Sequence, residues 1–274
     1  KQWENNYGGT STDQLNTIIA ISDGGYLLGG LSQSNANGNK TRNSFGGTDY
    51  WLVKINANGT KQWDSIYGGT STDWLSTIVA TSDNGYLLGG YSSSLANGNK
   101  SSSSYGADDY WLVKIDANGT KQWENIYGGT STDALLSNAL VATSNGNFLL
   151  GGSSQSNISG NKTLNSFGSV DYWVVTINAN GTKINEKVYG GLNVEYSRSM
   201  IAAKDGGYLI GGYSATGIDG NKTTANFGNY DYWLVKVAPA VELSATPRTT
   251  TICAGNTLDI DYSINSCNTF KAGN

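Results

Sequence analysis

Four acidic side chains recur just before short apolar stretches that are expected to form innermost β-strands. They are Asp13, Asp73, Asp133 and Glu195. If these stretches surround a central channel, the carboxylates would converge at its mouth, where they could hold a cation or raise one another's pKa. The alternative is local, because each carboxylate could instead accept backbone N–H groups within its own Gly-Gly-Thr-Ser-Thr-Asp turn.

A second recurrent group lies in a long loop of about 17 residues, which spans Ser32 to Thr48 and has three further copies. Each copy contains Gly-Asn-Lys and then an aromatic residue followed by glycine. Amide, ammonium and aromatic groups suit sugar hydroxyls and apolar sugar faces. The structural alternative is that glycine and asparagine form the turn while the aromatic ring fills the gap between units. The candidate ligand-binding residues are Asn39, Lys40, Phe45, Asn99, Lys100, Tyr105, Asn161, Lys162, Phe167, Asn221, Lys222 and Phe227.

The same loops contain further oxygen ligands at Asn37, Asn97 and Asp219. Ca²⁺ is therefore a candidate ligand of the loops, although each loop has few of the carboxylates that calcium sites use. No other cofactor is expected.

The sequence offers few side chains that are suited to catalysis. The chain has no histidine, which excludes Ser-His-Asp, Cys-His and histidine–metal arrangements. A carboxylate pair acting as acid and base is the remaining option, as in a glycoside hydrolase, but no asymmetric pair stands out. The acidic residues before each Tyr-Trp are expected to accept hydrogen bonds where a strand begins and to carry no chemistry; they are Asp49, Asp109, Asp171 and Asp231. We therefore expect no enzyme.

An internal repeat of about 60 residues positions all of these groups. The sequence DYWLVKINANGTKQWDSIYGGTST begins at Asp49, recurs almost unchanged from Asp109, and recurs more loosely from Asp171. A fourth copy begins at Asp231 and stops after one strand, and its missing half matches Lys1–Gly9. Such periodicity predicts an array of similar structural units.

Each unit carries four strand signals. In the second unit these are Thr77–Ser82, Gly85–Tyr91, Tyr110–Ile115 and Lys121–Tyr127. An Asp-Asn-Gly turn joins the first two strands, and its residues tolerate the positive φ angles of a tight hairpin. Many glycines and aromatics with few prolines also indicate an all-β protein.

Four antiparallel strands that are apolar on both faces are typical of a β-propeller blade. Three units are complete and the fourth lacks its outer strand, so pairing Lys1–Tyr7 with Tyr232–Val237 would close a ring and remove an exposed edge. We predict a four-bladed propeller over residues 1–237. A segment of a longer array, with five to seven blades, is the alternative.

The composition changes after the repeats. Pro239 and Pro247 predict a linker over residues 238–248, and residues 249–274 resemble the first strands of a β-sandwich. Cys253 and Cys267 could form a disulfide, which contributes about 3 kcal/mol in the chain-entropy model and favours an oxidising, exported setting. Two free thiols are the alternative.

Charge and hydropathy exclude two classes of partner. The net charge is −4 and no basic cluster is present, so binding to nucleic acid is not expected. No apolar segment approaches the roughly 20 residues that a membrane span needs.

The strings DGGYLLGG, DYWLVKINANGTKQW and YGGTSTD recur together in order. In this they resemble the tandem propeller repeats of secreted Bacteroidetes-type surface proteins, often exported by the type IX secretion system. The tail, with TICAGNTLDIDYSI, looks like the start of an immunoglobulin-like module. The resemblance implies a secreted or cell-surface protein whose leader has been removed, the secretion machinery as a partner during export, and adhesion or glycan contact.

Three functional hypotheses follow. The first is a non-enzymatic secreted or surface module for adhesion or glycan binding, within a larger secretion cargo. The second is a structural spacer or export cargo whose activity lies in other domains. The third is a carboxylate-based glycoside hydrolase.

Overall fold

The computed structural model describes residues 1–136, 138–239, 242–247 and 260–265. All the secondary-structure elements assigned in these ranges are β-strands. No helix that could cross a membrane is found in the same ranges. The all-β prediction is confirmed.

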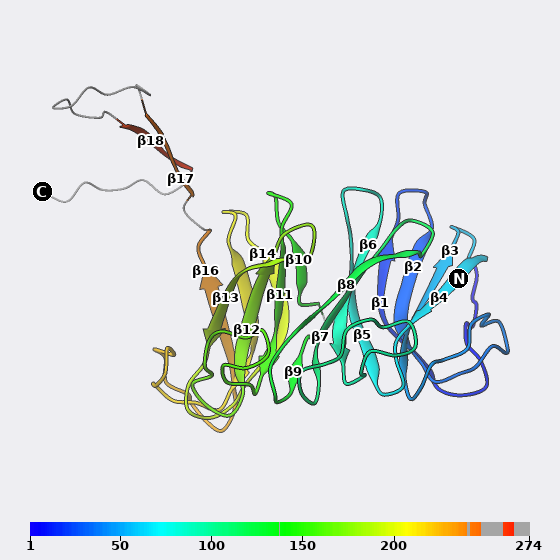
Figure 1. Ribbon diagram of the computed structural model, residues 1–274, viewed down its shortest axis with the longest axis horizontal. Coiled ribbons are helices and arrows are strands. Elements are labelled where there is room, and N and C mark those ends of the chain that lie inside the picture. The colour runs from blue at the N-terminus through cyan, green and yellow to red at the C-terminus, as the bar shows by residue number, and fades with distance from the viewer. Residues whose placement is uncertain (137, 240–241, 248–259, 266–274) are drawn as a thin grey trace, which may run out of the picture.

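Strands β1 to β16 form four antiparallel sheets, in which consecutive strands pair except that β9 pairs with β11 (Figure 1). The first contains β1 (Asp13–Ala20), β2 (Tyr26–Ser32), β3 (Asp49–Ile55) and β4 (Lys61–Tyr67). The second contains β5 (Asp73–Ala80), β6 (Tyr86–Ser92), β7 (Asp109–Ile115) and β8 (Lys121–Tyr127). The third contains β9 (Asp133–Ala134), β10 (Leu140–Ala142), β11 (Phe148–Ser154), β12 (Asp171–Ile177) and β13 (Lys183–Tyr189). The fourth contains β14 (Glu195–Ala202), β15 (Tyr208–Ser214) and β16 (Asp231–Val237).

The innermost strands begin earlier than the apolar pattern predicts. β5 starts at Asp73 rather than Thr77, because Asp73 pairs with Ser92 and its amide donates to the carbonyl of Thr48 in the preceding unit at 2.7 Å. A β-bulge between Leu75 and Thr77 absorbs the change of register. The apolar pattern in the sequence predicted only the second half of this strand, from Thr77 onward.

The third sheet departs from the others at its inner strand. Two more residues separate Asp133 from Val141 than separate Asp73 from Val79. The strand is therefore broken into β9 and β10, with Asn138 at a positive φ of 54° between them. This insertion accounts for the one repeat that is longer than its neighbours.

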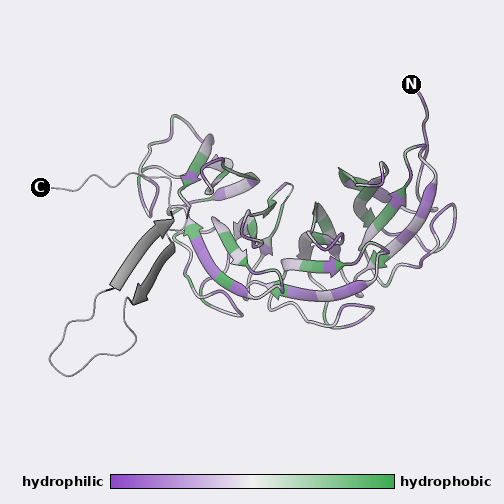
Figure 2. Cartoon of the chain, turned by 90° about the horizontal axis from the view of Figure 1, so that it is seen from above, coloured by the Kyte–Doolittle hydropathy of each residue, from purple (hydrophilic) through white to green (hydrophobic). Residues whose placement is uncertain are grey.

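The four sheets follow one another in an open arc, with Lys1 at one end and the fourth sheet at the other (Figure 2). The predicted pairing of Lys1–Tyr7 with β16 is not made. Lys1–Tyr7 instead lies against the β3–β4 turn, where Trp3 Nε1 donates to the carbonyl of Ala57 at 3.1 Å and the Tyr7 hydroxyl donates to that of Gly59. Because this segment is held at the first sheet, β16 pairs only with β15 among the described residues.

A tyrosine ladder joins each sheet to the next. The hydroxyls of Tyr50, Tyr110 and Tyr172 donate to the carbonyls of Trp111, Trp173 and Trp233 at 3.0–3.1 Å, with ring centroids 4.6–4.9 Å apart. Glycine is required beside each hydroxyl, since a Cβ on Gly90 would lie 2.7 Å from the Tyr50 oxygen. The two larger apolar clusters accordingly lie at these junctions, one between the first and second sheets and one reaching from the second to the fourth.

The C-terminal region contains a two-stranded sheet. β17 (Glu242–Pro247) pairs antiparallel with β18 (Ile260–Asn265). β17 lies within the segment predicted as a linker, and β18 lies within the region predicted to begin a β-sandwich. Cys253 and Cys267, with the disulfide predicted between them, lie outside the described residues.

Replacing Tyr110 by phenylalanine tests the ladder. The change removes the hydroxyl that donates to the buried carbonyl of Trp173, so we expect a loss of about 1 kcal/mol in the free energy of unfolding. Denaturant melts of Tyr110→Phe and of the control Tyr105→Phe measure this. The Tyr105 ring is half-exposed, and the control should unfold like the parent protein; equal effects of both changes would contradict the ladder.

Candidate functional site

The lysine of every Gly-Asn-Lys motif is buried, with 1–3% of its surface exposed. The Lys100 ammonium donates to the carbonyls of Ser94 and Ser102, and lies 5.8 Å from the centre of the Trp111 ring. Burial lowers the pKa of Lys100, while the negative charge of Asp73 acts in the opposite direction. Lys40, Lys162 and Lys222 hold their own loops in the same way. These lysines are internal supports of the loops.

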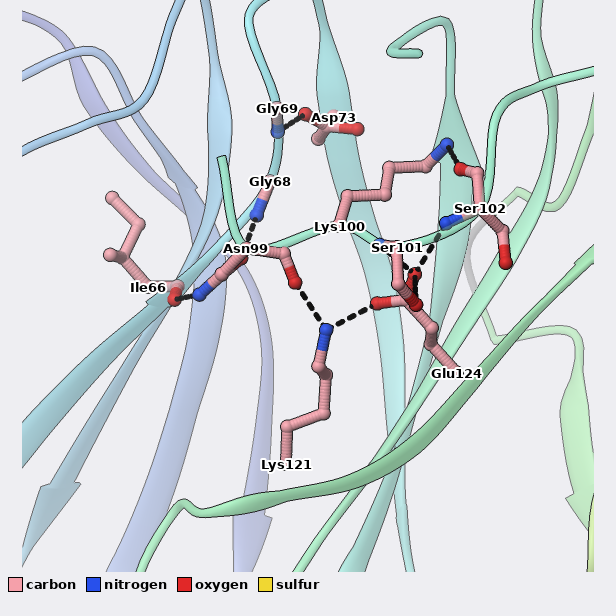
Figure 3. A network of polar contacts seen from close by, with 10 residues as sticks. All are labelled: Ile66, Gly68, Gly69, Asp73, Asn99, Lys100, Ser101, Ser102, Lys121 and Glu124. Carbon is pink, nitrogen blue, oxygen red and sulfur yellow. Dashed lines mark hydrogen bonds and ion pairs between the residues drawn. The ribbon is translucent and has the colours of Figure 1, made fainter. Parts of the chain in front are cut away.

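The asparagine of the motif connects neighbouring units. Asn99 Oδ1 accepts the amide of Gly68 at 2.9 Å, and Asn99 Nδ2 donates to the carbonyl of Ile66 at 2.8 Å (Figure 3). Asn39, Asn161 and Asn221 make the same pair of bonds to the chain that precedes their own unit. Both polar ends of each side-chain amide are thus engaged within the protein.

An ion pair on the outer strand completes this network. Lys121 binds Glu124 at 2.6 Å, and Glu124 accepts the amides of Ser101 and Ser102 in the long loop at 2.5 and 3.1 Å (Figure 3). Asp64 and Glu186 hold their loops through equivalent bonds to Thr41 and Thr163. Sequence reasoning missed these carboxylates, although the repeated Lys-x-x-Asp/Glu of the outer strand was a usable signal.

The loop aromatics pack on the loop of the following unit. A Cβ on Gly98 would lie 2.9 Å from the Phe45 ring, and one on Gly160 would lie 2.8 Å from the Tyr105 ring. Phe45, Tyr105 and Phe167 are 39–48% exposed, whereas Phe227, against which no following unit packs in the described part of the chain, is 100% exposed. The aromatic positions therefore fill gaps between units, as the structural alternative predicts.

The four acidic residues before the inner strands each hold their own turn. Asp13, Asp73 and Asp133 accept the amides of Gly9, Gly69 and Gly129 at 2.7 Å, and Glu195 accepts that of Gly191 at 2.8 Å. Serine hydroxyls at positions 34, 94, 156 and 214 donate to the same carboxylates at 2.7–2.8 Å. The four residues belong to four different sheets of an open arc, and no group of three or more possible metal ligands occurs among the described residues. The predicted channel-mouth ring is therefore absent from the part of the chain described here.

Pairs of carboxylates meet instead at each junction, which the sequence analysis did not anticipate. A Cβ on Gly68 would lie 1.9 Å from Asp49 Oδ1 and 2.8 Å from Asp73 Oδ2, so both acids flank one glycine. Asp171 and Glu195 flank Gly190 in the same way. The equal spacing of Asp49–Asp73, Asp109–Asp133 and Asp171–Glu195 in the sequence was the available signal.

The junction acids are fully buried, and several of their oxygens have no partner. Asp49, Asp109 and Asp171 each accept amides of the long loop through Oδ2, while Oδ1 is unpaired. Burial raises the pKa of Asp49 and Asp109 to about 7 and that of Asp171 to about 6, and the negative charge of the neighbouring acid acts in the same direction. The pairs of Asp49 and Asp109 therefore favour holding a proton near neutral pH, and the pair of Asp171 favours it at slightly lower pH.

A shallow hollow of about 570 Å³ lies over the junction of the second and third sheets. It brings together two predicted binding residues from neighbouring units, Tyr105 and Asn161, with Lys183 at its rim. Asn161 and Lys183 are already engaged, because the Lys183 ammonium donates to the Asn161 carbonyl. The rest of its lining is also largely polar and includes Ser102, Asn180 and Thr182.

Comparison with known proteins gives no family. No family model and no curated protein matches the chain. Among solved structures, the chain is similar to a variant of Synechocystis apocarotenoid oxygenase, with 11% identity and a TM-score of 0.40 over 86% of this chain and 53% of that one. It is also similar to an ACO/RPE65 chimera, with 10% identity and a TM-score of 0.40 over 91% and 55% of the two chains. The chain thus spans about half the length of these proteins, and at such values the likeness assigns no activity.

The expected adhesion or glycan-binding function is corrected by the geometry of the loops. The loop asparagines and lysines expected to meet a sugar are instead bonded inside the protein. The paired acids are also unsuited to glycoside hydrolysis, since they are closed off from any substrate.

Replacing Asp109 by asparagine tests the protonated junction pair. A raised folded-state pKa means that the folded protein binds the proton more tightly than the unfolded chain. The stabilisation is complete below about pH 4 and disappears as pH rises through about 7. Asp109→Asn mimics the neutral acid, so we expect it to be about 1–3 kcal/mol more stable than the parent at pH 8, with a smaller difference at pH 5.

Denaturant melts from pH 5 to 8 measure this difference. Asp83→Asn is the matched control, because Asp83 is paired with Lys114 at 2.8 Å and its pKa is lowered to about 2. The control should lose stability at both pH values. A loss of the same size at pH 5 and 8 in Asp109→Asn would contradict the shared proton.

Proposed function

We propose that the chain is a non-catalytic structural scaffold whose four sheets are successive blades of a β-propeller. One observation carries this proposal: the polar groups that recur in the repeat make equivalent intramolecular bonds in each unit. Asn39, Asn99, Asn161 and Asn221 all bridge to the preceding unit, and Lys40, Lys100, Lys162 and Lys222 all support their own loops. Binding and catalytic sites commonly break such symmetry, whereas folding requires it in every unit.

The propeller assignment rests on how the sheets meet. Each sheet stacks its tyrosine ladder on the next, and each long loop reaches across the junction, so the units follow one another face to face around the arc (Figure 2). Antiparallel four-stranded sheets that stack in this way are the units of propellers. The arc supplies a rigid spacing between whatever precedes and follows it.

In this proposal, lysines and protons neutralise the buried carboxylates of each unit. Each complete unit buries one lysine with an acid at each end of its long loop, as Lys100 lies between Asp73 and Asp109. One negative charge per unit is left over, and the raised pKa of Asp109 allows a proton to neutralise it. No cofactor is then needed, and a bound Ca²⁺ is the alternative.

An exported location, secreted or at the cell surface, belongs to the same proposal. Its support is the sequence resemblance to tandem repeats of secreted proteins. A scaffold of this kind would expose other modules at a fixed distance.

Replacing Lys100 by methionine separates a scaffold from a binding role. The change keeps the aliphatic stem but leaves the carbonyls of Ser94 and Ser102 and the charge of Asp73 without the ammonium, so we expect a loss of about 2–4 kcal/mol in unfolding free energy. Lys187→Met, on the exposed side of β13, is the control and should change little. Normal stability in Lys100→Met would contradict the scaffold role, as would catalytic turnover that Lys100→Met abolishes without unfolding the protein.

A further inference from the structure

The two ends of the arc carry the two halves of the contact that joins neighbouring sheets inside the chain. At each internal junction a tyrosine from one sheet enters a gap beside the glycine pair and tryptophan of the next. Tyr50, Tyr110 and Tyr172 are all 0% exposed in these positions. Tyr232 is the fourth member of the series and is 96% exposed.

The opposite end carries an empty counterpart of this gap. A hollow of about 230 Å³ beside the first sheet is lined by Gly29, Gly30 and Trp51, with Asn5 and Tyr7 across from them. Gly30 and Trp51 are the repeat equivalents of Gly90 and Trp111, which receive Tyr50 at the first internal junction. The hollow therefore has the lining that a ladder tyrosine uses.

Other apolar groups at the two ends follow the same rule. Leu15 and Ile18 of the first sheet are 52% and 55% exposed, whereas their equivalents Leu75 and Ile78 are buried against Gly29 at the first junction. On the fourth sheet Leu234 is 64% exposed, beside Gly211. Both faces are thus uncovered versions of a contact that the chain builds three times.

We propose that the fourth sheet docks on the first sheet of a second copy of this chain, so that Tyr232 of one copy enters the Gly30–Trp51 hollow of the other. The contact is head-to-tail, because it uses different surfaces on the two copies. It reproduces the internal junctions, so each copy already contains both complementary faces.

The N-terminal segment of the second copy completes the fourth sheet. Lys1–Tyr7 reads KQWENNY and differs from β8, KQWENIY, at one position. It already lies on the β3–β4 turn, where Tyr7 bonds Gly59 as Tyr67 of β4 bonds Gly119. A docked copy would therefore place this segment along the free edge of β16. Following the β7–β8 register, Tyr232 would oppose Tyr7 and Leu234 would oppose Asn5.

Charged groups support the same register. Lys1 and Glu4 are largely exposed and paired at 2.9 Å. They match Lys121 and Glu124, which clamp the loop at Asn99 and Ser101 in the second sheet. In the docked pair they would clamp the fourth loop at Asn221 and Thr223, beside β16, which has no outer-strand partner among the described residues.

A second copy fits these ends better than the same chain's own N-terminus. Lys1–Tyr7 is held at the first sheet, which lies at the far end of the arc from β16 (Figures 1 and 2). Closing the ring within one chain would require the arc to bend at its internal junctions. Docking a second copy leaves those junctions unchanged.

Mixed disulfide trapping tests the proposal on the full chain with Cys253 and Cys267 changed to serine. One preparation carries Leu234→Cys and the other carries Asn5→Cys. Mixing them under mild oxidation should give a cross-linked heterodimer, because directly opposed positions in an antiparallel pair are close enough for a disulfide. The matched control mixes Asn5→Cys with Ile218→Cys, an exposed loop position outside the contact, and should give no more than background.

Two results would overturn the proposal. The first is a chain carrying both Leu234→Cys and Asn5→Cys that forms only an intramolecular disulfide, which would mean closure within one copy. The second is absence of cross-linking together with a monomeric mass at all concentrations in sedimentation velocity.

Sedimentation velocity also tests the contribution of Tyr232 to self-association. Tyr232→Ala should weaken self-association at least tenfold while leaving thermal unfolding of the dilute protein unchanged, because the ring is exposed in a single copy. Ile218→Ala should associate like the parent. Association that is unaffected by Tyr232→Ala would show that the copies meet through another surface.

Discussion

The architecture depends on burying one ammonium group in each long loop. A buried lysine is tolerated only where carbonyls or carboxylates surround it, because a bare charge in a protein interior costs several kcal/mol. Each loop therefore folds back on its lysine, as the carbonyls of Ser94 and Ser102 do around Lys100. The acids at the two ends of the loop, Asp73 and Asp109, then have a counter-charge that lets them remain inside. Loop shape, strand ends and sheet junctions all follow from this one requirement.

The second organising feature is that several side chains of each unit contact the neighbouring units. The loop asparagine binds the chain before it, and the ladder tyrosine and loop aromatic bind the unit after it. Stability in such an array is approximately the sum of unit and nearest-neighbour terms. Among the described residues, the first and fourth sheets each have a neighbouring unit on one side only, which explains why Leu15, Phe227 and Tyr232 are exposed while their repeat equivalents are covered or partly covered.

Much of the fold could be predicted from the sequence, because the repeat contains local information. The apolar alternation of DYWLVKI and the turn residues around it predicted β7 and β8 nearly residue for residue. Closure of the ring could not be predicted, since the match of Lys1–Tyr7 to a missing strand is satisfied equally by its own β16 and by that of another copy. The site was predicted only in part. The repeated lysines and asparagines are important residues, but periodicity does not say whether a polar group points outward to a ligand or inward to a carbonyl. The pairing of Asp49 with Asp73 was missed because it joins two units, each of which was analysed alone.

The clamp between successive units also has an evolutionary consequence. Since the contact made by the second unit with the third is nearly the same as that made by the first with the second, the gene segments that encode them are interchangeable. Unequal recombination between such segments would add or remove whole units without creating an incompatible surface, wherever within the repeat the crossover fell. Arrays of different length could therefore arise in single steps, and the two-residue insertion between Asp133 and Val141 marks one copy that has since diverged from the others.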